Sequence, residues 1–154
     1  MIGALKPEEI EDVLTHQVLG RIACHANGIT YIVPVSYAYD GQYIYLHSKE
    51  GKKVSMMRAN PDICFETDQM ENMANWKSVI AWGKCEELTK EEDREVALKT
   101  LVDRILPLIS SETTHLTPHW PFPPENMGEI EGIVFRIKLL TKTGRFEKNE
   151  VHLS

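Results

Sequence analysis

The stretch ITYIVPVSYAYDGQYIYLHS, residues 29–48, decides the fold prediction because two strand-like segments flank a turn signal. Bulky residues recur with the two-residue period of a β-strand at Ile29, Tyr31, Val33, Val35, Tyr37 and Tyr39. Asp40-Gly41 is a strong signal for a two-residue hairpin turn, after which residues 42–48 run back. We therefore predict an antiparallel hairpin in which Pro34 lies opposite His47.

Alternation along this hairpin separates its side chains into two faces. The predicted core face carries Val33, Val35, Tyr37, Ile44, Leu46 and Ser48. The opposite face carries Pro34, Ser36, Ala38, Tyr43, Tyr45 and His47. Small residues, a proline and a histidine on one face suit a flat ligand lying against the sheet. A half-solvated barrel wall is the alternative interpretation.

Strand and helix patterns continue on both sides of the hairpin. Strand patterns cover residues 18–26, 29–39, 42–48, 62–67, 76–87 and 130–140. Helical patterns with start or stop signals cover residues 7–16, 52–59 and about 89–106. The prediction is an α+β domain, an antiparallel six-stranded split β-barrel with flanking helices, because closure removes sheet edges. A β-sandwich remains the alternative.

The segment after the hairpin, His47-Ser48-Lys49-Glu50-Gly51-Lys52-Lys53, marks a strand end, a glycine turn and a helix start. Free backbone N–H groups and the positive end of the helix dipole gather there. Lysines at this end oppose the dipole, and a bound anion would offset them. A phosphate held by Ser48 Oγ, the helix N–H groups and lysines is one prediction, and a solvated basic loop is the other. There is no Walker pattern and no G-x-G-x-x-G motif, so other nucleotide sites are not predicted.

The bulk composition sets limits on location and partners. The 154 residues fit a single domain, residues 1–154, and the formal charge of −6 argues against a nucleic-acid partner. No apolar run approaches the roughly 20 residues that cross a bilayer, so no membrane partner is expected. The N-terminus lacks a signal-peptide pattern, and the three cysteines form no disulfide framework. These features predict a cytoplasmic protein.

Residues 110–128 form a proline-rich segment that we predict to be a long loop. His115 and His119 lie within it, but Pro118 is incompatible with a helical His-x-x-x-His metal site, so no metal is predicted. Aromatic residues beside them, Trp120 and Phe122, suit packing on the barrel or a lid over a ligand.

Several motifs together resemble the FMN-binding split-barrel superfamily, the family of the pyridoxamine 5′-phosphate oxidases, and most closely its nitroimidazole-resistance (Nim-type) branch. The matching segments are residues 31–37, 44–48, 51–53, 60–65, 78–84 and 143–145. Their order and spacing cover about residues 5–146. The oxidases' own pyridoxal-phosphate signature is not recognisable near the C-terminus, so vitamin B6 oxidation is not predicted.

The resemblance implies a homodimer with FMN at the subunit interface and a small-molecule substrate. Val35, Ser36 and Tyr37 would line the isoalloxazine through backbone and side chain, and Lys52 and Lys53 would bind the phosphate. His47 and Ser48 would contact the ring system and the phosphate side. Residues near 78–82 would reach the partner's flavin. The full set of implied cofactor-binding residues is Pro34, Val35, Ser36, Tyr37, His47, Ser48, Gly51, Lys52, Lys53, Ser78 and Trp82.

The function that follows is an FMN-dependent oxidoreductase, such as a nitro-group or flavin reductase. His47 is the candidate catalytic residue, because an unperturbed imidazole pKa near 6.5 suits proton transfer around neutrality. A non-catalytic flavin- or haem-binding protein on the same barrel is the alternative, with FAD and haem as alternative cofactors.

Overall fold

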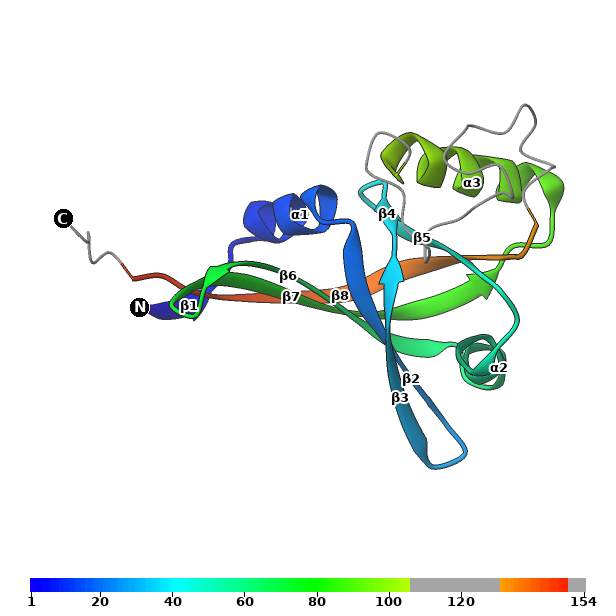
Figure 1. The fold of residues 1–154 in the computed structure, drawn as a ribbon, viewed down its shortest axis with the longest axis horizontal. Coiled ribbons are helices and arrows are strands. Elements are labelled where there is room, and N and C mark those ends of the chain that lie inside the picture. The colour runs from blue at the N-terminus through cyan, green and yellow to red at the C-terminus, as the bar shows by residue number, and fades with distance from the viewer. Residues whose placement is uncertain (106–130, 150–154) are drawn as a thin grey trace.

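The structure, a computed structural model, describes residues 1–105 and 131–149 (Figure 1). Its strands are β1 (Ile2–Ala4), β2 (Leu19–Ala26), β3 (Ile29–Ser36), β4 (Ala38–Tyr39), β5 (Tyr43–Ser48), β6 (Asp62–Asn72), β7 (Asn75–Glu87) and β8 (Ile133–Glu147). Its helices are α1 (Pro7–His16), α2 (Lys52–Ala59) and α3 (Glu91–Ile105). The α+β, antiparallel class predicted from the sequence is confirmed. The loop predicted at 110–128 lies outside the described residues, as do His115 and His119.

The strands form one antiparallel sheet in the order β3-β2-β6-β7-β8-β5-β4, with β1 paired to the end of β8. Long strands β6, β7 and β8 run along the molecule, and the β2–β3 hairpin projects from them (Figure 1). The sheet curls so that β3 contacts β5, yet these two strands do not pair. The barrel is therefore split between β3 and β5.

The predicted hairpin register is wrong in two respects. Asp40 uses its carboxylate to accept the amides of Gln42 at 2.9 Å and Tyr43 at 2.7 Å. The turn therefore moves one residue onward to Gly41-Gln42, where Gly41 supplies a φ of +96°. Pro34 does not face His47, because β3 pairs with β2 along its length and places Pro34 opposite Arg21.

The long predicted strand at 29–39 breaks at Tyr37, which accounts for part of the difference between the predicted six strands and the eight found in the described residues. The amide of Tyr37 donates to the carbonyl of Val18 at 3.0 Å, outside the β3 ladder. The chain then crosses to β4, which pairs with β5 through Ala38–Tyr45 and Tyr39–Ile44. The short strand β1 was not predicted, and β6 and β8 run beyond their predicted ends.

Two apolar cores hold these layers together. The barrel interior contains the buried side chains of Tyr37, Ile44, Leu46, Phe65 and Ile137, with Val35 beside them, so the predicted core face is confirmed at its centre. A second core lies under α3 and encloses Ala38 and Tyr45 from the opposite face of the hairpin. That part of the face predicted for a flat ligand is therefore covered by a helix. No described helix is long and apolar enough to cross a membrane.

Candidate functional site

The segment joining β5 to α2 is the first part of the candidate site. Helix α2 begins at Lys52, its N-cap is Gly51, and no side chain caps it. The first amides of a helix have no partner within the helix, so those of residues 52–54 point out from this end. In the part of the chain that the structure describes, nothing lies within 4 Å of the position that a Gly51 Cβ would occupy. The helix end is therefore open to a small acceptor such as a phosphate oxygen.

Lys53 is the most informative residue in this segment. Its side chain is partly buried beside Cys24 of β2, and this burial lowers the pKa of the ammonium below its ordinary value. Among residues 1–105 and 131–149, Lys53 has no carboxylate within ion-pair distance and makes no hydrogen bond through its Nζ. A partly desolvated cation without a counter-charge costs free energy, which a bound anion would return.

Lys52 links the start of α2 to the open edge of the sheet. Its Nζ lies 5.0 Å from the centroid of the Tyr31 ring on β3. This is a cation–π contact across the split between β3 and the β5–α2 segment. Lys52 and Lys53 therefore lie on two sides of the helix start, one toward β3 and one toward the barrel interior.

His47 lies next to these lysines but is held by the main chain. Its Nε2 donates to the carbonyl of Glu131, an approach that Gly132 permits through a φ of +107°. A Cβ on Gly132 would lie 2.7 Å from this nitrogen. Burial is the main cause that lowers the pKa of His47; the hydrogen bond to Glu131 opposes it, and positive charge on Arg94, Lys53 and Lys49 adds to it. The imidazole is therefore neutral at pH 7, with Nδ1 as its acceptor nitrogen.

Ser48 and the β3 residues differ in what they can offer a ligand. The Ser48 hydroxyl donates to the carbonyl of Lys49 at 2.9 Å, which leaves its oxygen lone pairs for other donors. Pro34 is exposed, Ser36 is partly buried, and Val35 is buried in the barrel. All three lie on β3, one edge of the sheet, where peptide groups have no neighbouring strand. A flat heterocycle could hydrogen-bond to this edge.

Tyr37 is enclosed by the core rather than open to a ligand. Its side chain is fully buried, its hydroxyl donates to the carbonyl of Leu14 at 2.7 Å, and its ring meets Phe65 edge-on at 4.9 Å. Since its amide is also used, neither its side chain nor its N–H is available to line an isoalloxazine. This placement disagrees with the side-chain role implied by the resemblance.

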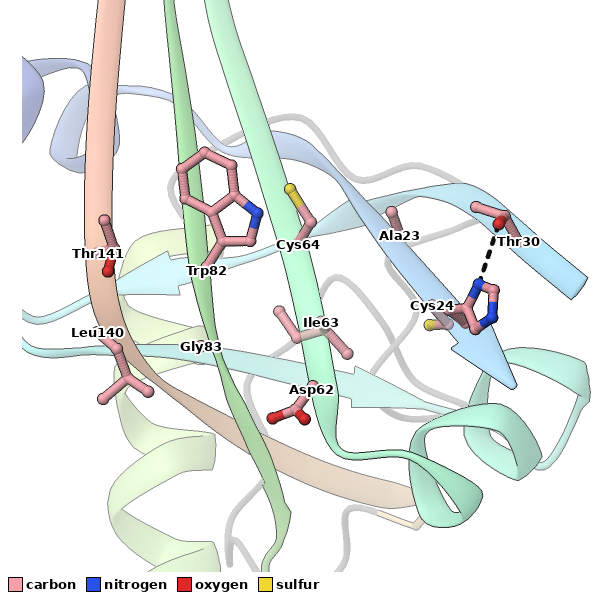
Figure 2. A pocket seen from close by; sticks show the side chains of 11 residues that line it. Ala23, Cys24, Thr30, Asp62, Ile63, Cys64, Trp82, Gly83, Leu140 and Thr141 are labelled. Atoms are coloured by element: carbon pink, nitrogen blue, oxygen red, sulfur yellow. Dashed lines mark hydrogen bonds between the residues drawn. The ribbon is translucent and has the colours of Figure 1, made fainter. Parts of the chain in front are cut away.

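Ser78 and Trp82 lie on the outer face of the sheet, away from the lysines. The Ser78 hydroxyl donates to Glu66 at 3.0 Å. Trp82 is 44 % exposed and lies in one row with Cys64 and Ala23 across β7, β6 and β2 (Figure 2). This row lines a hollow of about 480 Å³. Within one chain, the structure does not bring Ser78 or Trp82 to Lys53, whose neighbour Cys24 points into the barrel.

The same outer face carries an ionic cluster that was not predicted from the sequence. Arg21 donates to Glu66 at 3.2 Å and to Asp68 at 2.9 Å. Burial and the neighbouring Asp68 raise the pKa of Glu66 above its ordinary value. The alternation of buried and outward-facing residues along β2 and β6 could have predicted this cluster. Arg21 and the two carboxylates occupy outward positions of these strands, on either side of buried residues.

One family model matches most of the chain. The model of the family described as pyridoxamine 5′-phosphate oxidase matches residues 6–145. The chain is similar to the crystal structure of a FAD-binding protein from Mesorhizobium loti, with 30 % identity, TM-score 0.73, and coverage of 96 % of this chain and 99 % of that one.

Two more distant structures share the fold. One is a candidate 5-nitroimidazole antibiotic resistance protein from Bacteroides thetaiotaomicron, with 17 % identity, TM-score 0.71, and coverage of 95 % and 87 %. The other is a FAD-binding protein from Mycobacterium smegmatis, with 21 % identity, TM-score 0.64, and coverage of 94 % and 98 %.

Proposed function

Since the chain belongs to the pyridoxamine 5′-phosphate oxidase family, we propose that it is an FMN-dependent oxidoreductase that works as a homodimer. The observation that carries the proposal is Lys53, a partly buried ammonium without a carboxylate partner in the described chain, at the open start of α2. A phosphate monoester supplies the two negative charges and the acceptor oxygens that this end of the helix lacks.

Each residue of the site has a distinct role in this proposal. Lys53 and Lys52 neutralise the phosphate, and the first amides of α2 donate to its oxygens. The free edge of β3 at Val35 and Ser36 faces the ring system, whose rim carries donors and acceptors for peptide groups. When bound, the flavin supplies the electron-transfer chemistry, and the protein supplies position and electrostatics.

The site is completed by a second copy of the chain. Ser78 and Trp82 lie on the outer sheet face, so a role near the flavin requires them to come from the partner. That face exposes large apolar side chains, which mark protein–protein contact surfaces. They include Leu19, Ile32, Ile80 and Trp82. A cytoplasmic location belongs to the same proposal, because all three cysteines are free thiols.

FMN is favoured over FAD by the phosphate chemistry of the lysines. FMN ends in a phosphate monoester, whereas FAD places a less charged diester in the same position. The Mesorhizobium loti and Mycobacterium smegmatis proteins are described as FAD-binding, which makes FAD the competing cofactor. Acid release of the bound flavin followed by chromatography distinguishes the two. Release of FAD alone would contradict the choice of FMN.

The principal experiment is a titration of the purified protein with FMN, followed by absorbance near about 370 and 450 nm. We expect saturable binding that Lys53→Ala weakens and that the exposed Lys99→Ala on α3 leaves unchanged. A protein that remains colourless and ignores added FMN would contradict the proposal. A Soret band in the purified protein would support the haem-binding alternative.

His47 acts in this proposal as a neutral group beside the ring and phosphate. Its depressed pKa makes it a proton acceptor through Nδ1 rather than a proton donor at neutral pH. His47→Ala should therefore reduce turnover of a nitro compound or a free flavin more than it weakens FMN binding. Equal losses in turnover and affinity would leave His47 as a packing residue.

A non-catalytic flavin-binding protein is the second candidate. It is favoured by the main-chain hydrogen bond that occupies Nε2 of His47, the candidate acid–base group of the described site. Anaerobic addition of NADH or NADPH separates the candidates, because a reductase bleaches its flavin absorbance whereas a passive binder stays yellow.

A further inference from the structure

The outer sheet face carries a row of polar residues across three strands. Asp68 of β6 pairs with Ser78 of β7, and Ser78 pairs with Arg145 of β8. Directly paired residues of an antiparallel sheet share a face, so all three side chains lie on the face that holds the ionic cluster. Since neighbouring strands are about 4.8 Å apart, Asp68 and Arg145 flank Ser78 on opposite sides.

The charges at the acidic end of this row, around Asp68, do not balance within one chain. Arg21 is the cation in ion-pair contact with both Glu66 and Asp68, so one guanidinium serves two carboxylates. The raised pKa of Glu66 is the expected response to burial next to a second negative group. The acidic side of the row therefore has a negative charge in excess.

In the described residues, Arg145 carries an unpaired positive charge on the other side of Ser78, opposite in sign to the excess at the acidic end. Its side chain is exposed, and among residues 1–105 and 131–149 it takes part in no ion pair or hydrogen bond through its side chain. Apolar side chains surround the row, with Ile80 next to Ser78 on β7 and Leu19 on β2. If another molecule covered this face, burial of Arg145 and of the excess negative charge near Asp68 without partners would be strongly unfavourable.

We propose that Arg145 of one protomer pairs with Glu66 and Asp68 of a second copy of this chain, and that this contact sets the register of the dimer. An isologous interface brings the same surface against itself. A two-fold axis near Ser78 exchanges the positions on its two sides, so each acidic pair meets the other copy's arginine. The inference rests on the homodimer of the proposed function and adds the residues that select the partner.

Two opposite charge reversals test this pairing in the FMN-loaded protein. Asp68→Arg and Arg145→Glu should each raise the dimer dissociation constant about a hundredfold or more, as measured by sedimentation velocity. An equimolar mixture should assemble again, because both junctions of the heterodimer are complementary.

The matched controls are Glu95→Arg and Lys99→Glu, exposed residues of α3 that undergo the same charge changes. Asp68→Asn serves if arginine beside Arg21 prevents folding, and it should weaken the dimer by a smaller factor.

The outcomes separate this inference from the proposed function. Single variants that dimerise like the wild type would overturn the pairing while dimer and flavin remain. Folded variants that stay monomeric after mixing would also overturn it, because a contact within one chain gives no rescue by mixing. A wild type that binds FMN as a monomer would overturn both the pairing and the homodimer, but not flavin binding.

Discussion

The start of α2 and the outer sheet face both display positive charge, but in opposite settings. At the helix start, Lys53 is partly buried with no carboxylate partner in the described chain, next to open backbone amides. On the outer face, Arg21 is already paired and lies among exposed apolar side chains. The first setting is suited to a small anion, and the second to a surface of matching shape and charge. Positive charge alone therefore does not identify the kind of partner.

The largest expected effect comes from placing a charge among the exposed apolar side chains of the outer face. Trp82→Asp should raise the dimer dissociation constant at least a hundredfold, because a large aromatic side chain buried in an interface contributes about 2 kcal/mol or more and a two-fold dimer loses two of them. Thermal unfolding of the monomer should change little, since Trp82 is 44 % exposed. Sedimentation velocity measures the first quantity and calorimetry the second. A fully dimeric variant would assign the interface to another surface.

The second effect should be confined to the helix start. Lys53→Met removes the cation but keeps the apolar stem, so we expect FMN affinity to fall about thirtyfold while dimerisation is unchanged. Without ligand, the variant should be more stable than the wild type, because a partly desolvated unpaired ammonium is removed.

The pH dependence of this stability difference has a definite sign. Folding lowers the pKa of Lys53 below its ordinary value of 10.5, so the folded state disfavours the charge. The wild type should therefore approach the stability of Lys53→Met as pH rises through the depressed pKa toward 10.5. Urea unfolding at several pH values measures it. A constant difference would show that desolvation does not act on Lys53.

The third effect tests whether Tyr37 belongs to the core or to the flavin site. Tyr37→Phe should lower the free energy of unfolding by about 1–2 kcal/mol, because the buried carbonyl of Leu14 loses its donor. FMN affinity should stay within about twofold of the wild type. A large loss of affinity with unchanged stability would return Tyr37 to the cofactor site.

The smallest effect belongs to Glu66. Folding raises the pKa of its carboxyl above 4.5, so this group adds stability at low pH that is lost as pH rises through the raised value. Glu66→Gln should remove this dependence, changing stability by only about a few tenths of a kcal/mol because the cluster is partly solvated. Urea unfolding of the monomer between acidic and neutral pH measures the difference. A dependence that survives in the variant would assign it to another group.

Much of the fold could be predicted from local patterns. Helices α1 and α2 have the bounds expected from proline, glycine and the apolar stripes, and the alternation of Val35, Tyr37, Ile44 and Leu46 identifies the barrel interior. The turn after Tyr39 could not be placed by a dipeptide signal alone. The side chain of Asp40 there bonds to two amides and extends the pairing by one residue.

The candidate site was less accessible to sequence reasoning because it depends on tertiary contacts. The lysines were found from their position against the helix dipole, which is a local signal. The contact of His47 with Glu131 and the ionic cluster of Arg21 join residues far apart in sequence. The burial of Tyr37 likewise depends on α1, which supplies the carbonyl that accepts a hydrogen bond from its hydroxyl.

The split between β3 and β5 determines where the barrel can open in solution. Each strand keeps its full ladder on one side, β3 with β2 and β5 with β8, so widening the gap breaks no interstrand hydrogen bond. One contact beside this gap is the cation–π pair between Lys52 of α2 and Tyr31 of β3, which is weak and reversible. Opening the gap therefore separates apolar side chains of the barrel interior but breaks neither of these two ladders. Amides of β2 and β8 should exchange with deuterated solvent at the rate of global unfolding even while the gap opens and closes.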